Sequence, residues 1–163
     1  MFAFIGQEYT FAIGLILSLA VGALIGAERE LRGKPAGIST HAFVVGGSMI
    51  FAFISNIVDP ESTSRIAAQI ITGVGFLGAG IILKNDSGRI TNLTTAASIW
   101  FSASIGMAIG FGMYVMALLG LGYALVVPRI PGFKKIKKTT HDINLPSPNA
   151  IPQALRKHIT GKK

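Results

Sequence analysis

Cysteine is absent from the 163-residue chain, and charged residues make up only 13% of it. Without cysteine there are no disulfide bonds, no thiolate metal sites and no thiol nucleophiles. A soluble domain carries roughly 25% charged residues, so this chain has too few of them to cover a globule with polar groups. Half of the residues are apolar and the mean hydropathy is +0.57. We therefore expect an integral membrane protein.

Acidic residues are also scarce, and their distribution explains the net charge of +8. Residues 1–128 contain six basic and six acidic side chains, which cancel, whereas residues 129–163 contain nine basic side chains and one acid, Asp142. The excess charge therefore belongs to the C-terminal segment. Nucleic acid is not an expected partner, because no aromatic or helical reading element accompanies this charge.

Long uncharged stretches predict the membrane spans, since a helix needs about 20 residues to cross the hydrocarbon core. Asp59-Pro60 ends one stretch, because a residue before proline is pushed out of helical geometry. Gly110 and Gly112 predict a tight reversal that divides the long stretch after Leu93, and Ser39 or Thr40 is expected to cap the second helix. The predicted spans are about 9–27, 41–58, 66–83, 93–109 and 110–127.

The basic residues predict the orientation. With five crossings, fourteen Lys and Arg residues lie on one side and Arg65 alone lies on the other. Because basic loops stay in the cytoplasm, the N-terminus is expected outside and the C-terminus inside. The fold class is thus an all-α bundle of five transmembrane helices over residues 1–128. Residues 129–163 are expected to form a basic, largely disordered cytoplasmic tail that attracts anionic lipids.

Small residues recur every four positions in two of the predicted spans, and they crowd a third. Such spacing lets helix backbones approach closely in lipid. Packing inside one bundle is the first interpretation, and homodimerisation or a permeation path are the alternatives. The three sets are Gly14, Ser18, Gly22 and Gly26; Ser98, Ser102, Gly106 and Gly110; and Thr72, Gly73, Gly75, Gly78, Ala79 and Gly80.

Ionisable side chains that could move protons or bind ions are missing from the predicted spans, which contain no Asp, Glu, Lys or Arg. Ion-coupled pumping through acidic side chains is therefore not expected, although glycine carbonyls of the third span leave passive permeation open. No phosphate-binding loop, metalloprotease motif or hydrolase motif is present, so neither an enzyme nor a cofactor is expected. The G-x-G-x-x-G letters at 73–78 lie inside a span, where no strand precedes them.

Polar residues gather at the two predicted membrane surfaces. On the outer side, Glu8, Asp59 and Glu61 are weak candidates for a Mg2+ site, because this cation prefers oxygen ligands. On the cytoplasmic side, the polar set is either a solvated rim that sets topology and caps helices, or a docking site for an anionic ligand or a protein. It consists of Glu28, Arg29, Glu30, Arg32, Lys34, Thr40, His41, Lys84, Asp86, Arg89, Asn92, Thr94 and Thr95.

Several motifs in order resemble the MgtC/SapB family of bacterial membrane proteins over about residues 12–128. They are GAERE at 26–30, KPAGI at 34–38, THA at 40–42, DP at 59–60, RIAAQ at 65–69, GVGFLGAG at 73–80 and LTTAASIW at 93–100. Two departures stand out. Position 39 is Ser where the family usually has Arg, and the larger members carry a folded cytoplasmic domain after the last span, so this chain resembles a short form that lacks it.

The resemblance implies a five-helix protein of the bacterial inner membrane. Members related to MgtC are linked to growth in low magnesium and to survival inside macrophages. They act through other membrane proteins, including restraint of ATP synthase. A non-enzymatic regulatory protein is therefore expected, and a passive transporter or channel for Mg2+ or another small ion is the alternative. The positions that the family singles out are Glu28, Arg29, Lys34, Thr40, His41, Arg65, Gln69, Gly73, Gly75, Gly78, Gly80, Thr94, Thr95 and Trp100.

Overall fold

A computed structural model describes residues 2–84 and 90–130, and within these ranges the chain forms five α-helices. These are α1 (Phe2–Leu31), α2 (Ile38–Val58), α3 (Ser64–Ile81), α4 (Leu93–Gly110) and α5 (Tyr114–Val126), and α5 continues into a short 3-10 helix, η1 (Val127–Arg129). The predicted all-α bundle of five helices is confirmed. The predicted tail lies outside the described residues from position 131 onward.

Four of the helical segments are long and apolar enough to cross a membrane: Gly6–Leu31, Ile38–Val58, Ser64–Ile81 and Leu93–Gly110. The fifth apolar segment, Tyr114–Arg129, is shorter than the others. At 1.5 Å per residue it spans about 24 Å, which is less than a hydrocarbon core of about 30 Å. The orientation relative to the two sides of the membrane stays a prediction.

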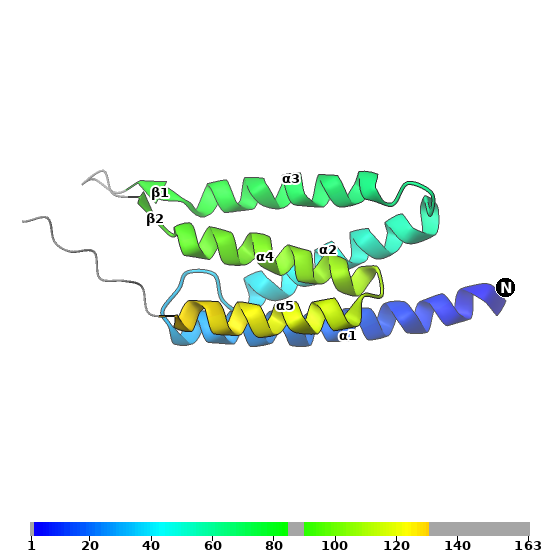
Figure 1. Ribbon diagram of the computed structural model, residues 1–163, viewed down its shortest axis with the longest axis horizontal. Helices are drawn as coiled ribbons and strands as arrows, with labels where there is room; N and C mark the ends of the chain where they lie inside the picture. Colours follow the sequence, from blue (N-terminus) through cyan, green and yellow to red (C-terminus); the bar gives the residue numbers. More distant parts are fainter. Residues whose placement is uncertain (1, 85–89, 131–163) are drawn as a thin grey trace, which may run out of the picture. The chain divides into compact units, whose positions relative to one another are not determined.

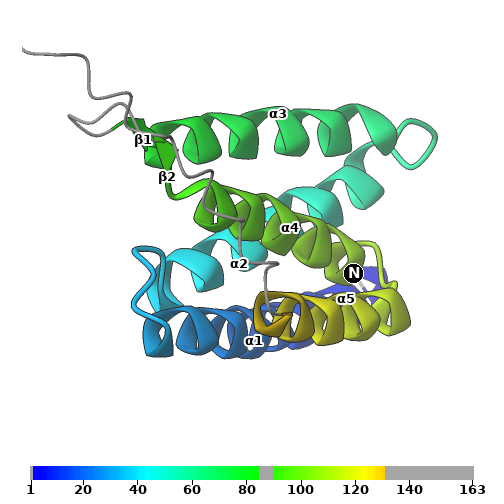
Figure 2. The same cartoon turned by 60° about the vertical axis from the view of Figure 1, so that its left-hand side comes forward.

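The helices run alternately up and down and form three layers (Figures 1 and 2). Helix α3 forms one outer layer, α2 and α4 form the middle layer, and α1 and α5 form the other outer layer. The C-terminal ends of α1, α3 and α5 therefore meet at one end of the bundle. Arg29, Arg32 and Arg129 lie at this end, whereas Arg65 begins α3 at the opposite end.

The predicted small-residue face of α1 packs against α2. A Cβ atom added to Gly22 would meet the backbone of Ala42, and one added to Gly26 would meet the backbone of Ile38. Neighbouring backbones approach this closely only where glycine leaves the space, which is how helices associate in lipid. Packing within the chain is thus confirmed for this face.

The corresponding face of α4 packs against the other side of α2. A Cβ atom on Gly106 would meet the carbonyl oxygen of Val45, and one on Gly110 would meet that of Met49. Around this contact, Val45 and Met49 are fully buried together with Ile105 and Ile109 in the apolar core of α1, α2, α4 and α5. Helix α2 is therefore clamped between two helices by close backbone contacts.

Helix α3 is held on one side only. Its buried residues are Ile70, Val74 and Gly78, and the first two join a second apolar core with α2 and α4. A Cβ on Gly78 would lie 3.7 Å from the Ala96 Cβ, an ordinary contact. The other glycines of α3 have no atom within 4 Å of such a Cβ: Gly73, Gly75 and Gly80. Most of this face is therefore directed away from the bundle.

Several helix boundaries differ from the predicted spans. Helix α1 continues to Leu31 instead of ending at Ala27, because neither proline nor glycine interrupts it before Gly33, where φ is +64°. Helix α5 begins at Tyr114, after a reversal in which Gly112 adopts a φ of +74°. This reversal confirms the predicted turn, since a positive φ favours glycine.

A two-residue antiparallel ladder joins α3 to α4 and was not predicted from the sequence. Strand β1 (Leu83–Lys84) pairs with β2 (Ile90–Thr91), with Leu83 opposite Thr91. After it, Asn92 adopts a left-handed conformation with φ of 64° and precedes the first residue of α4. Its side-chain amide donates a hydrogen bond to the Ile81 carbonyl at 3.3 Å, which ties the start of α4 to the end of α3.

The packing of α2 against α4 predicts that Gly106→Ala destabilises the protein, whereas Gly75→Ala does not. Both changes raise helix propensity equally, so the difference in stability between the two variants isolates the contact of the added methyl group with Val45. Overpacking of this kind costs about 1 to 3 kcal/mol. Thermal unfolding in detergent, followed by near-UV circular dichroism, measures the difference. Equal melting temperatures for the two variants would contradict the described contact.

Candidate functional site

Two charged side chains are buried at the end of α1. Glu28 and Arg29 are 6% and 5% exposed, and the Arg29 Nη1 atom lies 3.7 Å from the Glu28 carboxylate. Arg32, one helical turn further on, forms a second ion pair with the same carboxylate. The expectation of a solvated rim is wrong for Glu28 and Arg29. Helix α1 continues to Leu31, beyond its apolar part. Its last turns therefore still pack against α2 and α4, and these two side chains are buried there.

The two arginines connect α1 to elements far away in the sequence. Arg29 donates a hydrogen bond to the Thr94 carbonyl in the first turn of α4, at 3.3 Å. Arg32 donates to the Pro128 carbonyl in η1, at 2.7 Å. One carboxylate therefore positions two guanidinium groups that fasten the first, fourth and fifth helices together. Within the described ranges neither oxygen of the Glu28 carboxylate makes a hydrogen bond, so the two ion pairs compensate for the burial of its charge.

Glu30 fixes the turn between α1 and α2. Its carboxylate accepts a hydrogen bond from the Ile38 backbone N–H at 2.9 Å. A negative charge at this helix start is favourable, because the free N–H groups there carry partial positive charge. The helix thus begins at Ile38 with Gly37 before it, and the prediction that Ser39 or Thr40 caps it is wrong.

His41 is completely buried between α2 and α4, where its Nδ1 lies 2.9 Å from the Ser102 hydroxyl. That hydroxyl already donates its proton to the Ser98 carbonyl at 2.8 Å. While the hydroxyl donates to Ser98, its oxygen accepts from a protonated Nδ1 of His41; a hydroxyl turned toward His41 would instead donate to an unprotonated Nδ1. The His41 Nε2 atom and the Thr95 hydroxyl, both buried, have no hydrogen-bond partner within the described ranges.

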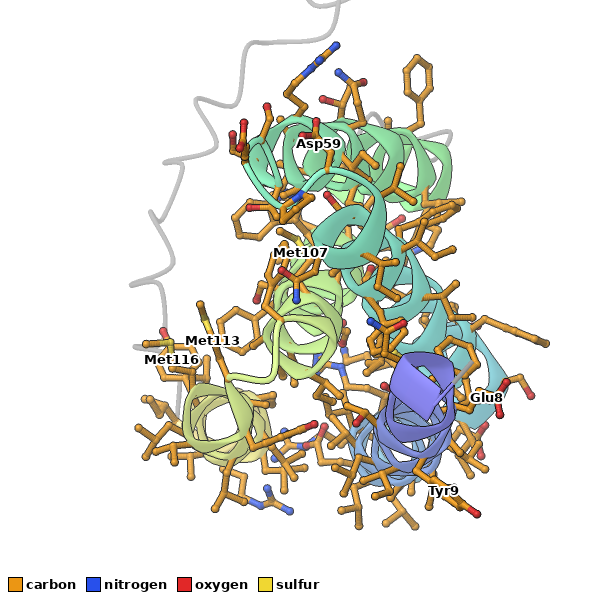
Figure 3. The ribbon with its side chains drawn as sticks, turned by 90° about the vertical axis from the view of Figure 1, so that its right-hand side faces the viewer. Glu8, Tyr9, Asp59, Met107, Met113 and Met116 are labelled. Carbon is orange, nitrogen blue, oxygen red and sulfur yellow. The ribbon has the colours of Figure 1, made fainter. Side chains whose placement is uncertain are left out.

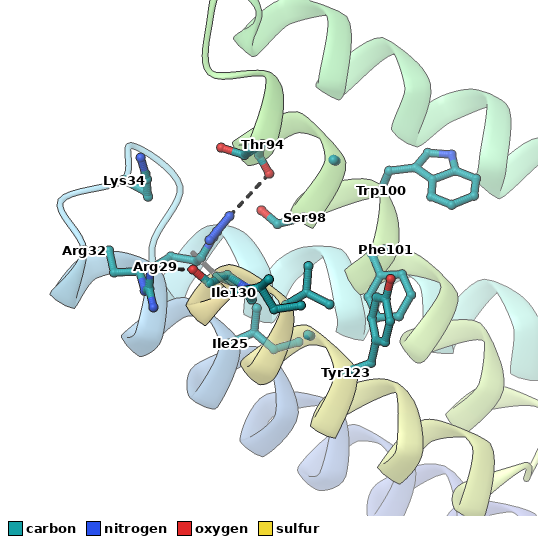
Figure 4. Close-up of a pocket in the computed structure, with 14 residues that line it drawn as sticks. Ile25, Arg29, Arg32, Lys34, Thr94, Ser98, Trp100, Phe101, Tyr123 and Ile130 are labelled. Atoms are coloured by element: carbon teal, nitrogen blue, oxygen red, sulfur yellow. Dashed lines mark hydrogen bonds between the residues drawn. The ribbon is translucent and has the colours of Figure 1, made fainter. Parts of the chain in front are cut away.

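A pocket of about 720 Å³ opens beside this cluster between α1, α4 and α5. Figure 4 shows its two ends: Arg29, Arg32 and Lys34 lie at one, and Trp100, Phe101 and Tyr123 lie at the other. The rings of Phe101 and Tyr123 pack with their centroids 5.2 Å apart. The remaining lining is mostly apolar: Ile25, Thr94, Ala97, Ser98, Ala124, Val127, Pro128 and Ile130. The site is therefore a cationic mouth that continues into an apolar groove.

Other candidates from the sequence lie on a second groove, between α2 and α3. Gln69 and Gly73 line this groove of about 490 Å³ with Phe43 and Phe51. Its other lining residues are Val44, Gly47, Ser48, Ile66, Ile70, Val74 and Leu77. Among the remaining candidates, Arg65 is exposed in the first turn of α3, and Gly75 and Gly80 are exposed further along that helix.

The structure does not gather the acidic candidates for a Mg2+ site. Glu8 lies on the exposed part of α1, whereas Asp59 lies at the turn between α2 and α3, and the two side chains are directed apart (Figure 3). Glu61 is exposed in that same turn. In the part of the chain that the structure describes, no three His, Asp or Glu side chains stand close enough to hold a metal ion.

The structure thus brings together most cytoplasmic candidates and separates the α3 set from them. Glu28, Arg29, His41 and Thr95 are buried in one cluster, Lys34, Thr94 and Trp100 line the adjoining pocket, and Thr40 is half-buried in the first turn of α2. Sequence reasoning placed Glu30 and Arg32 in the cytoplasmic polar set without singling them out, and it missed Ser102 as a site residue. The spacing of four between Glu28 and Arg32 was a usable signal, because such residues share one helix face.

Comparison with known proteins decides the family. The family model described as MgtC family matches residues 15–135. The chain belongs to the MgtC family. Together with its apolar helices, this membership establishes a multi-pass protein of the bacterial inner membrane.

Three relatives illustrate the likeness within the MgtC family. The chain is 43% identical to the protein MgtC of Salmonella typhimurium strain LT2, over 68% of this chain and 47% of that protein. It is 45% identical to YhiD of Escherichia coli strain K12, which is named as a proposed magnesium transporter, over 72% and 58%. It is 36% identical to the protein SrpB of Synechococcus elongatus over 82% and 80%.

The chain spans about half the length of the Salmonella relatives that it matches. No solved structure matches it. The comparisons therefore cover the helical bundle with its two pockets, and what the whole relatives do is a matter for proposals.

The buried ion pair predicts that Glu28→Gln destabilises this MgtC-family bundle much more than Glu30→Gln does. The first change leaves Arg29 buried without its counter-charge, at a cost of about 3 kcal/mol. In the second, the exposed amide oxygen still accepts the hydrogen bond from Ile38. Unfolding in increasing sodium dodecyl sulfate, followed by fluorescence of the single tryptophan, gives both values. Similar midpoints for the two variants would argue against a buried structural charge at position 28.

Proposed function

We propose that this chain is a non-enzymatic regulatory protein that supports adaptation to magnesium limitation by binding another membrane protein. Membership of the MgtC family and the magnesium-related name given to YhiD support the link to magnesium. The observation that carries the regulatory part is the apolar groove between α2 and α3, which has the properties of a docking surface for a transmembrane helix.

The floor of the groove favours close approach of a helix. A Cβ atom added to Gly47 or Gly73 would have no atom within 4 Å, so the backbone is open there. In lipid, where apolar surfaces gain nothing from leaving water, helices associate through such close backbone contacts. On the α2 wall of the groove, Phe43 and Phe51 are exposed and offer aromatic contact area to the approaching helix.

A single amide adds a polar contact to the groove. Gln69 lies five residues after the first residue of α3, and its side chain makes no hydrogen bond to any described residue. Polar side chains at this depth hydrogen-bond across helix interfaces, with a gain of about 0.6 to 2 kcal/mol. A partner helix with a polar side chain at the matching height would therefore gain specificity as well as affinity.

The alternative of passive transport receives less support from the packing. The α2 backbone occupies the space beside Gly22 and Gly26 of α1 and beside Gly106 and Gly110 of α4, and most glycines of α3 are directed outward instead of toward α4. Within residues 2–84 and 90–130, no glycine-lined passage separates α3 from α4, since Gly78 meets Ala96 there.

We take ATP synthase, which the family resemblance implies, as the first partner to test, through photo-crosslinking from position 43.

The groove predicts opposite outcomes for two leucine substitutions two residues apart. Gly73→Leu fills the floor of the groove and should abolish support of growth at limiting magnesium in a host that lacks its own family member. Gly75→Leu lies outside the groove lining and should retain that support. Both variants should remain folded, because a Cβ atom at either position has no atom within 4 Å; far-UV circular dichroism of the purified proteins checks this.

Flux measurements separate regulation from transport. Full-length protein in liposomes should give no more Mg2+ entry than empty liposomes, as reported by an enclosed Mg2+-sensitive dye. Entry well above that background would favour the transporter. Equal growth of the Gly73 and Gly75 variants would reject the groove as the docking surface whatever the flux.

A further inference from the structure

We propose that the pocket between α1, α4 and α5 binds one anionic glycerophospholipid, with its phosphate at Arg29, Arg32 and Lys34 and an acyl chain along Phe101 and Tyr123. This proposal is independent of the groove between α2 and α3. It concerns a site within the helical bundle, not the basic tail.

The polar end of the pocket matches a phosphate. Three cationic side chains line it, and the lining contains no acid. Glu28 neutralises only one of the two arginines that it contacts, and the side-chain ammonium of Lys34 makes no ion pair or hydrogen bond with any described residue. The buried Arg29 Nε also has no hydrogen-bond partner in the described part of the chain. A net positive charge with unused donors therefore faces the pocket.

The apolar end matches a lipid chain and not a soluble anion. Beyond the three cations, all but two of the lining side chains are apolar or aromatic. Phe101 lies eight residues into α4, so the groove descends about 12 Å from the helix start toward the membrane interior. A phospholipid in the adjacent leaflet has the same order of groups, with its phosphate at the surface and its chains below.

Charge also disfavours the chain's own tail as the occupant. The tail follows directly after Ile130 on the pocket wall, but residues 129–163 carry nine basic side chains and one acid. Such a segment is repelled by the cationic mouth. The basic end is predicted to face the cytoplasm, where anionic lipids attract basic groups at about 1 kcal/mol for each.

The single tryptophan provides a direct test, because Trp100 lines the pocket. Full-length protein is reconstituted into phosphatidylcholine bilayers that contain increasing amounts of phosphatidylglycerol with brominated acyl chains. Bromine quenches tryptophan only on contact. We expect brominated phosphatidylglycerol to quench Trp100 more strongly than brominated phosphatidylcholine at equal content, with a relative binding constant about fivefold higher. Equal quenching by the two lipids would overturn the proposal.

Two pairs of variants locate the effect. Lys34→Glu should abolish the preference for phosphatidylglycerol, whereas Arg65→Glu, which removes the same charge at the opposite end of the bundle, should keep it. Ala97→Phe fills the groove from an exposed position and should reduce quenching, whereas Ala79→Phe on the exposed part of α3 should not. A preference that survives Lys34→Glu, or that is lost equally with Arg65→Glu, would assign binding to the tail or to general charge and reject the pocket.

A soluble competitor distinguishes a lipid from a small anion. Glycerol phosphate carries the same phosphate without chains, and at millimolar concentration it should leave the quenching by phosphatidylglycerol unchanged. If it removed the preference, the pocket would be an anion site that takes soluble phosphates, and the proposal of a lipid would fail.

Discussion

Close backbone contact on both sides of α2 is the constraint on which the rest of the bundle depends. Gly22 and Gly26 bring α1 against one side of α2, and Gly106 and Gly110 bring α4 against the other. Because lipid offers no hydrophobic driving force between helices, these contacts and the polar bonds beside them must hold the bundle together. They fix the relative heights of three helices, and this in turn fixes which side chains meet at the bundle end.

The buried charge cluster follows from that register. Because Gly26 packs against Ile38, the next residues of α1 face the starts of α2 and α4, and Glu28 and Arg29 are almost fully buried there. Their charges are tolerated because the carboxylate contacts two guanidinium groups and each guanidinium also reaches a carbonyl on another helix. His41 and Ser102 extend this polar layer across α2 and α4. The arrangement of the helices at this end is therefore fixed by ion pairs and hydrogen bonds, whereas their arrangement in the middle of the bundle is fixed by close backbone packing.

Much of the fold could be predicted from the sequence, because uncharged stretches and glycine periods are local signals. Asp59-Pro60 and Gly112 mark real helix ends, and the two four-residue periods mark real seams. The end of α1 could not be predicted in the same way. Charge next to an apolar stretch usually indicates a solvated surface, and only the three-dimensional contact with α4 shows that Arg29 is enclosed.

The candidate site was predicted less completely than the fold, because its residues come from four elements that the sequence does not align. Glu28, Arg29 and His41 were identified, but Ser102 counted only as a packing residue, although its hydroxyl is the hydrogen-bond partner of His41. The outward direction of Gly73 and Gly75 was likewise undetermined, since a bare glycine face predicts close approach without saying what approaches. That direction is the property that separates the two grooves: one presents open backbone to lipid or to another helix, and the other presents fixed cations. Under the two proposals, one bundle meets a membrane protein on the α3 side and an anionic lipid on the α5 side, and neither contact disturbs the core between α1, α2 and α4.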